Sequence, residues 1–122
     1  MKSKPIIIVA GEPNSIFFEI FFKTIHLKKI KSPLILIGSI KLLDLQMRKL
    51  NFKKKIRLLD IKGLNNHKLN NESINLIDIH YNTNVAFDKI THKSREYIKK
   101  SFEIAFKIIS NGISDKMING PI

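Results

Sequence analysis

Cysteine is absent from the 122-residue sequence, which excludes a disulfide scaffold, cysteine-ligated zinc, an iron–sulfur cluster and a thiol nucleophile. Long apolar runs are absent too. The most apolar segment, Ile16–Phe22, is interrupted by Glu19 and ends at Lys23, well short of the ~18 residues of a membrane span. The short run Pro5–Ala10 leads directly into Gly11 and lacks the cleavage pattern of an export signal. We therefore expect a cytoplasmic protein with no membrane partner.

Acidic residues are few, and 22 Lys and Arg against 10 Asp and Glu give a net charge of +12. Such a charge commonly indicates nucleic acid or an anionic membrane. Here the basic residues are 19 Lys and only 3 Arg, and Ile, Lys and Asn together make 53 of the 122 residues. These three amino acids have A- and T-rich codons, so DNA base composition accounts for much of the lysine. Nucleic acid is therefore a disfavoured partner, and Lys53–Lys55 is interpreted as a solvated run.

The composition is typical of a globular protein, with 43% hydrophobic and 26% charged residues. Short β-branched or aliphatic runs alternate with longer segments of helical spacing, which predicts an α/β fold with a largely parallel sheet and flanking helices. The expected strands are Pro5–Ala10, Ser32–Ile37, Lys55–Leu59, Ile74–Ile79 and Asp115–Ile122. The expected helices are Ile16–Lys28, Ile40–Leu50 and a third that begins at Thr91 or Ser94 and stops at Asn111-Gly112. No internal domain boundary is expected within residues 1–122.

Two segments between these elements are less regular. Asp60–Glu72 is rich in asparagine and is interpreted as a surface loop, while Tyr81–Ile90 has no clear pattern. At the start of the first helix, Asn14 and Ser15 are capping candidates, and Glu19 is within reach of a capping box.

Gly11-Glu12-Pro13 joins the first strand to the first helix. Backbone N–H groups at such a helix start suit an anion such as phosphate. The dinucleotide fingerprint GxGxxG and the phosphate-binding GxxxxGK[ST] are both absent, so a tight structural turn remains the other interpretation.

The sequence offers no assembled catalytic or metal-ligating group. The four histidines, His26, His67, His80 and His92, form no HxH or HxxxH pair. We interpret them as solvent-facing or capping side chains, and we expect neither a metal site nor a catalytic residue in this chain.

The two ends of the sequence together resemble a known family. Ile7–Ile16, which contains Gly11-Glu12-Pro13, is similar to the opening strand and G-[DE]-P-A-G-I-G loop of the 4-hydroxythreonine-4-phosphate dehydrogenases. Ser114–Ile122, which contains Asn119-Gly120-Pro121, is similar to that family's D-A-L-V-T-G-P-[IV] strand. Asn14 and Ser15 depart from the small residues of the first motif, which bears on how closely a ligand approaches the backbone there.

The resemblance implies an isocitrate/isopropylmalate dehydrogenase-like α/β fold, of which this chain is the N-terminal portion and in which downstream segments complete the sheet. It implies NAD-dependent oxidation and decarboxylation of 4-phosphooxy-threonine in pyridoxal phosphate biosynthesis, with a divalent metal held by histidines in the clefts of a homodimer. Six residues of this chain would line the cleft: Gly11, Glu12, Pro13, Asn119, Gly120 and Pro121. The family's metal ligands and its substrate-binding His-Thr pair come later, so we expect the chain alone to be inactive and to bind neither NAD nor metal.

Two other interpretations stay open. One is a small basic α/β module that binds a phosphate-bearing ligand or nucleic acid. The other is a structural subunit completed by a partner chain. Because the last strand and the many-sided apolar helix Ile16–Ile25 would lack cover, we also expect the chain to associate with itself in solution.

Overall fold

The structure, a computed structural model, describes residues 4–66, 68–88 and 93–121. These residues form a five-stranded sheet in the order β3-β4-β2-β1-β5, in which every neighbouring pair is parallel. The strands are β1 (Ile6–Val9), β2 (Leu34–Gly38), β3 (Ile56–Leu58), β4 (Ile74–Asp78) and β5 (Lys116–Asn119). The predicted α/β fold with a parallel sheet and flanking helices is confirmed.

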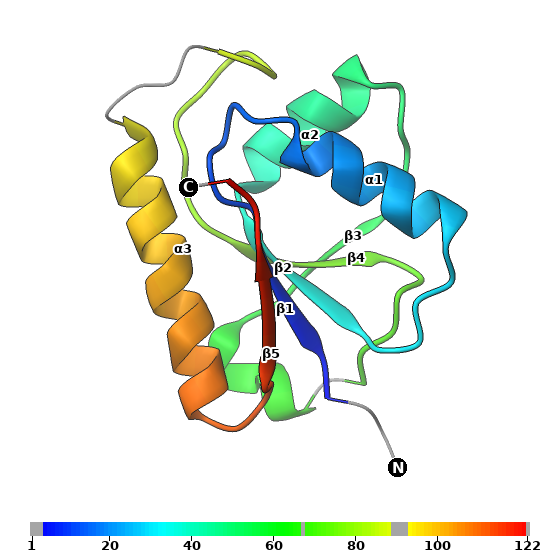
Figure 1. The fold of residues 1–122 in the computed structure, drawn as a ribbon, viewed down its shortest axis with the longest axis vertical. Helices are drawn as coiled ribbons and strands as arrows, with labels where there is room; N and C mark the ends of the chain where they lie inside the picture. The colour runs from blue at the N-terminus through cyan, green and yellow to red at the C-terminus, as the bar shows by residue number, and fades with distance from the viewer. Residues whose placement is uncertain (1–3, 67, 89–92, 122) are drawn as a thin grey trace.

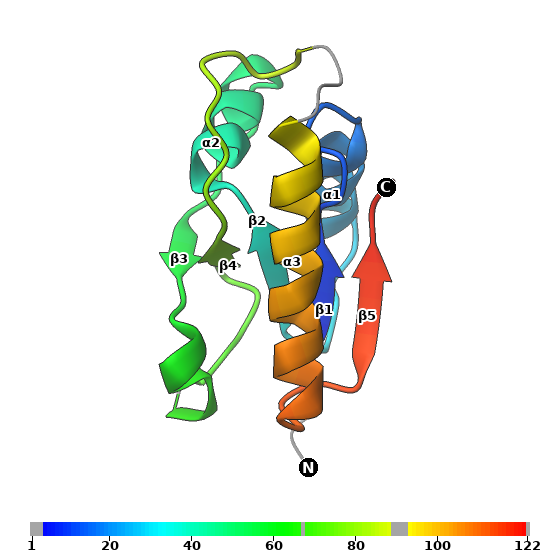
Figure 2. The same ribbon diagram turned by 90° about the vertical axis from the view of Figure 1, so that its left-hand side faces the viewer.

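Three α-helices cover the sheet in two layers. They are α1 (Phe17–Leu27), α2 (Ile40–Lys49) and α3 (Lys93–Ser110). Helices α1 and α2 lie on one face, and α3 crosses the opposite face over β1 and β2 (Figures 1 and 2). Each helix runs back from the carboxyl end of one strand toward the amino end of a later one, as parallel strands require.

The middle of the sheet is the core of the molecule. Strand β2 is buried along its whole length, and Ile7 and Val9 of β1 and Leu76 of β4 are fully or almost fully shielded from solvent. The unbroken aliphatic runs of β1 and β2 suit strands covered on both faces, whereas a strand with one wet face alternates apolar and polar residues. The outer strand β5 is mostly exposed, which agrees with its position at an edge.

The start of α1 differs from the sequence expectation. The capping position is Ile16, which makes no side-chain capping bond, and the Ser15 hydroxyl accepts from the N–H of Phe17 at 3.2 Å. The capping box with Glu19 is therefore wrong. Ser15 lies one residue before the cap, so its hydroxyl reaches the first helical N–H and not the N–H groups of the next turn.

The segment Asp60–Glu72 is not wholly a loop, because a six-residue 3-10 helix, η1 (Ile61–Asn66), begins it. Asp60 favours this turn: its carboxylate accepts from the N–H of Lys62 at 3.1 Å, and its carbonyl accepts from the N–H of Gly63 at 3.1 Å. Of the residues described, no helix is both long and apolar enough to cross a membrane.

Candidate functional site

The two motif segments meet at the carboxyl ends of β1 and β5. These strands are neighbours, with Val9 paired to Asn119, so the chain leaves both strands at the same edge of the sheet. The N–H of Gly120 donates to the Val9 carbonyl at 2.8 Å, and the N–H of Glu12 donates to the Pro121 carbonyl at 2.6 Å. Residues 11–13 and 119–121 therefore form one continuous structure, which we call the carboxyl-edge wall.

Glycine is required at two positions of this wall. Gly11 has φ of +76°, and a Cβ there would collide with the Pro121 carbonyl and lie 2.8 Å from the carbonyl carbon of Gly120. A Cβ on Gly120 would collide with the Ala10 carbonyl and lie 2.8 Å from Cγ of Phe17. The glycines in both motifs thus allow two backbone segments and the first helix to pack in direct contact.

Several backbone N–H groups at the wall and at the start of α1 already have acceptors within the protein. Four N–H groups of this segment are satisfied: Glu12 donates to the Pro121 carbonyl, Asn14 to the Glu12 carboxylate, Ser15 to the Glu12 carbonyl, and Phe17 to the Ser15 hydroxyl. Of the two interpretations left open by the sequence, these bonds favour the structural turn. One of these acceptors is a carboxylate, which repels a phosphate bound beside it.

That carboxylate belongs to Glu12, which is half-buried. One of its oxygens, Oε1, accepts from the N–H of Asn14 at 3.1 Å and from the hydroxyl of Ser94 at 3.2 Å. Ser94 comes from the first turn of α3, so this bond ties the wall to the helix on the opposite face. Such a group can accept further hydrogen bonds from a ligand hydroxyl or ammonium, and it repels anionic groups.

Residues 81–88 cross the same edge as a strap without regular secondary structure. The fully buried side chain of Gln46, on α2, donates to the Pro13 carbonyl at 3.1 Å and to the Ala86 carbonyl at 2.9 Å. The Asn14 side chain accepts from the N–H of Asp88 at 3.0 Å and donates to the hydroxyl of Tyr81 at 3.4 Å. Gln46 and Asn14 thus fasten the strap to the wall.

An open hollow of about 260 Å³ lies between this strap and the start of α3. Its lining is mainly polar and consists of Tyr81, Asn82, Thr83, Asn84, Val85, Asp88 and Lys93. Tyr81 joins the hollow to the wall through its bond with Asn14. The hollow has nearly the volume of a small-molecule site.

A buried tyrosine on α3, Tyr97, contacts both the end of β2 and the strap. The hydroxyl of Tyr97, on α3, accepts from the N–H of Ser39 at 2.9 Å, and the Tyr97 ring packs on that of Tyr81 with centroids 5.1 Å apart. Burial raises the pKa of Tyr97, and the nearby Asp78, Tyr81 and Glu12 raise it further. Tyr97 is therefore a neutral structural group at physiological pH.

Metal-ligating side chains do not gather here. Within residues 4–66, 68–88 and 93–121, no three His, Asp or Glu side chains are placed to hold a metal ion. His26 and His80 are exposed, as expected, whereas His67 and His92 lie outside the described residues. The residues described do not fit a complete metal site.

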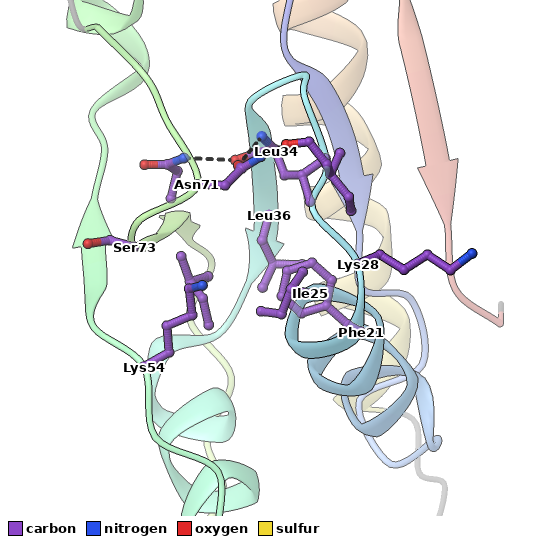
Figure 3. A pocket seen from close by; sticks show the side chains of 11 residues that line it. Phe21, Ile25, Lys28, Leu34, Leu36, Lys54, Asn71 and Ser73 are labelled. Carbon is purple, nitrogen blue, oxygen red and sulfur yellow. Dashed lines mark hydrogen bonds between the residues drawn. The ribbon is translucent and has the colours of Figure 1, made fainter.

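A different hollow lies at the opposite, amino end of the strands (Figure 3). Phe21, Ile25 and Leu36 form its apolar side, and its volume is only about 30 Å³, which holds a single water molecule. Asn71 closes one side: it accepts from the N–H of Leu34 at 2.9 Å and donates to the carbonyls of Ile30 and Ser32. This hollow is a packing feature of the turn into β2.

The six residues predicted to line a cleft thus lie side by side in the wall, while their role toward a ligand stays a prediction, and the structure adds side chains that the sequence did not single out. Ser94, Gln46 and Tyr81 come from different elements, so spacing along the chain gives no signal for them. Asn14 did give a signal, because it stands where the similar family has a small residue.

No protein-family model and no curated protein matches this sequence. Solved structures do match its fold. A crystal structure of a 4-hydroxythreonine-4-phosphate dehydrogenase from Burkholderia phymatum superposes with a TM-score of 0.83 at 16% identity, covering 98% of this chain and 36% of that chain. The 4-hydroxythreonine-4-phosphate dehydrogenase from Klebsiella pneumoniae gives a TM-score of 0.80 at 17% identity, covering 98% of this chain and 37% of that chain. The chain therefore shares the fold of part of these dehydrogenase structures and spans little more than a third of their length.

Proposed function

We propose that this chain forms the N-terminal α/β part of an oxidoreductase that resembles 4-hydroxythreonine-4-phosphate dehydrogenase. The reaction would be NAD-dependent oxidation and decarboxylation of 4-phosphooxy-threonine, in pyridoxal phosphate biosynthesis. One observation supports this most strongly: the segments that resemble the family's two motifs, at opposite ends of the sequence, are joined by the bond from the Glu12 N–H to the Pro121 carbonyl.

Within that enzyme the carboxyl-edge wall would line one side of the cleft. Gly11 and Gly120 set its shape, and Glu12 supplies its carboxylate. Because the N–H groups of Glu12 and Asn14 are already bonded and Glu12 supplies a carboxylate, we expect the part of the substrate that meets the wall to be a hydroxyl or ammonium group and not the phosphate.

The proposed enzyme depends on NAD and a divalent metal, and we assign the ligands of both to residues other than those described. No catalytic acid or base is assigned to this chain. We further propose that the complete enzyme is a cytoplasmic homodimer, in keeping with the family that the sequence resembles.

Ligand-observed saturation-transfer NMR tests this proposal on the full 122-residue chain with 4-phosphooxy-threonine as probe. We expect weak, competable binding in which the protons near the ammonium and hydroxyl groups receive the strongest transfer. 4-Hydroxythreonine is the matched ligand that lacks only the phosphate, and it should bind similarly. Binding that requires the phosphate, or no binding at all, would contradict the assigned role of the wall.

The basic binding module is the second candidate, and the net charge of +12 is the observation that favours it. A titration with a short DNA duplex at several salt concentrations separates the two functions. A surface that follows phosphates loses affinity steeply as salt rises. We expect only weak duplex binding; tight binding with a steep salt dependence would favour the module over the oxidoreductase.

A further inference from the structure

Two asparagines of this chain are each followed by glycine, in Asn111-Gly112 and Asn119-Gly120. An Asn-Gly pair is prone to deamidation, because glycine has no Cβ to keep its backbone nitrogen away from the side-chain amide of the preceding asparagine. Both asparagines are exposed to solvent, so exposure does not distinguish them. The two pairs differ in how the fold holds the nitrogen of each glycine.

Asn111-Gly112 ends helix α3, at the opposite end of β5 from the carboxyl-edge wall (Figure 1). The Gly112 N–H donates to the Ile109 carbonyl at 3.0 Å. The Ile113 N–H donates to the Ile108 carbonyl at 3.3 Å. These two bonds form the glycine cap that commonly ends a helix. Gly112 has φ of +78°, and a Cβ there would point into open space.

The Asn111 side chain is free to turn toward the Gly112 nitrogen. Among the residues that the structure describes, its amide group has no hydrogen-bond partner. The one bond that engages the nitrogen lies in the exposed last turn of a helix, and such turns open at little cost in free energy. The nitrogen of Gly112 is therefore released often while the rest of the chain stays folded.

The Asn119-Gly120 pair is held more firmly. The Gly120 N–H donates to the Val9 carbonyl at 2.8 Å, which continues the ladder between β1 and β5. Gly120 is buried, and the Ala10 carbonyl and the Phe17 ring lie so close that even a Cβ would collide with them. The Asn119 side chain donates to the Gly120 carbonyl at 2.9 Å. Reaction here requires the end of β5 to leave its place beside β1.

We infer that Asn111 is a site of spontaneous deamidation and that the fold protects Asn119 from the same reaction. The backbone nitrogen of Gly112 attacks Cγ of Asn111, so a bond from this nitrogen to Cγ forms and the bond from Cγ to Nδ2 breaks. Nδ2 leaves as ammonia and takes up, through solvent, the proton that the Gly112 nitrogen loses. Water then opens the succinimide ring at either carbonyl carbon and yields isoaspartate or aspartate. No group is oxidised or reduced.

Isoaspartate at position 111 alters the junction between α3 and β5. Its main chain contains an extra methylene, so the two cap bonds to the Ile108 and Ile109 carbonyls cannot both keep their geometry. Its carboxylate also lies at the C-terminal end of α3, where the helix dipole disfavours a negative charge. The last turn of α3 therefore opens more often. This turn leads into β5, whose far end carries the wall residues.

Incubation of the full 122-residue chain in warm, mildly alkaline buffer tests this inference, which is independent of the proposed function. Peptide mass spectrometry locates each deamidated residue, and labelling by an isoaspartate-specific methyltransferase identifies the isomer. In the folded chain we expect deamidation at Asn111 to be at least about tenfold faster than at Asn119. In urea that unfolds the chain, the two rates should become similar, because the protection of Asn119 depends on the sheet.

Asn111→Ser is the matched variant, because it removes the reactive amide and keeps Gly112 in the cap. Circular dichroism checks that both proteins are folded before incubation. Incubation should accelerate hydrogen exchange of residues 106–113 in the wild type and not in this variant. Deamidation of the folded chain that is as fast at Asn119 as at Asn111 would overturn the inference. So would a folded chain without isoaspartate at position 111 under conditions in which the unfolded chain forms it.

Discussion

Gly11 and Gly120 lie against each other at the ends of β1 and β5, although more than a hundred residues separate them in the sequence. The contact exists because β5 is added beside β1 at the edge of the sheet, after α3 has crossed the opposite face (Figure 2). Neither glycine can gain a Cβ without striking backbone of the neighbouring segment. The fold and the candidate site therefore depend on the same two residues.

Alanine substitutions should reveal this dependence. We expect Gly11→Ala to lower the free energy of unfolding by about 2–4 kcal/mol, because it combines a left-handed backbone with a collision. Gly120→Ala should cost about 1–3 kcal/mol through the collision alone. Gly112, with φ of +78° and open space around it, is the control, and its alanine variant should lose only about 1 kcal/mol. Urea denaturation measures all three; equal losses would show that the contact is unimportant.

Gln46 should control the order of the strap. Replacing it with leucine keeps the volume but removes both bonds, to Pro13 and Ala86, at a cost of about 1–2 kcal/mol. Hydrogen exchange in residues 82–88 should then accelerate more than exchange in α3. The control is Asn84→Ala, which removes one exposed bond from Lys41. If exchange of residues 82–88 in Gln46→Leu were no faster than in Asn84→Ala, Gln46 would not hold the strap.

The raised pKa of Tyr97 predicts that the protein loses stability at alkaline pH. Its folded-state pKa is raised by burial above the ordinary value of about 10, so the folded state holds the phenol proton more tightly than the unfolded state does. The free energy of unfolding therefore does not depend on this proton below a pH of about 10. Above that pH it falls by up to about 1.4 kcal/mol per pH unit. The loss in stability above pH 10 should be smaller in Tyr97→Phe. Parallel pH profiles of wild type and variant would refute the assignment.

Divalent metals should bind this chain only weakly. Among the residues described, no three His, Asp or Glu side chains are placed to hold a metal ion, and the two segments that resemble the family's motifs contain none of its metal ligands. Calorimetric titration with zinc, magnesium and cobalt should show no stoichiometric site. Submicromolar binding that a His80→Ala variant abolished would mean that this chain itself supplies a metal ligand.

The sequence predicted the sheet and helices well, because each uses a distinct apolar pattern. The continuous aliphatic run of β2 and the helical spacing of α3 are typical of buried strands and of a helix that packs along one side. The predicted capping box at Glu19 is wrong because the cap is Ile16, one residue after Ser15. Sequence spacing alone does not locate a helix end to within one residue. The 3-10 helix after Asp60 depends on local bonds from a single carboxylate, which leave no apolar periodicity.

The sequence predicted the two backbone segments of the site but not the side chains that other elements contribute to it. Residues 11–13 and 119–121 were found because they resemble short motifs, and parallel pairing of β1 with β5 brings them together. Ser94 and Gln46 were not predictable, since a serine at a helix start and a glutamine within a helix have many ordinary roles. Their importance arises from tertiary contacts between residues 33 to 82 positions apart.

The central claim is that the two ends of the chain form one wall that faces the ligand. Two-dimensional ¹H–¹⁵N NMR of the full chain, titrated with 4-phosphooxy-threonine, tests this claim most directly. We expect saturable shifts confined to the amide signals of residues 10–12, 14, 94, 119 and 120 that weaken in Glu12→Gln, with no change at Lys53–Lys55. Shifts centred on those lysines, or none at the wall, would contradict it.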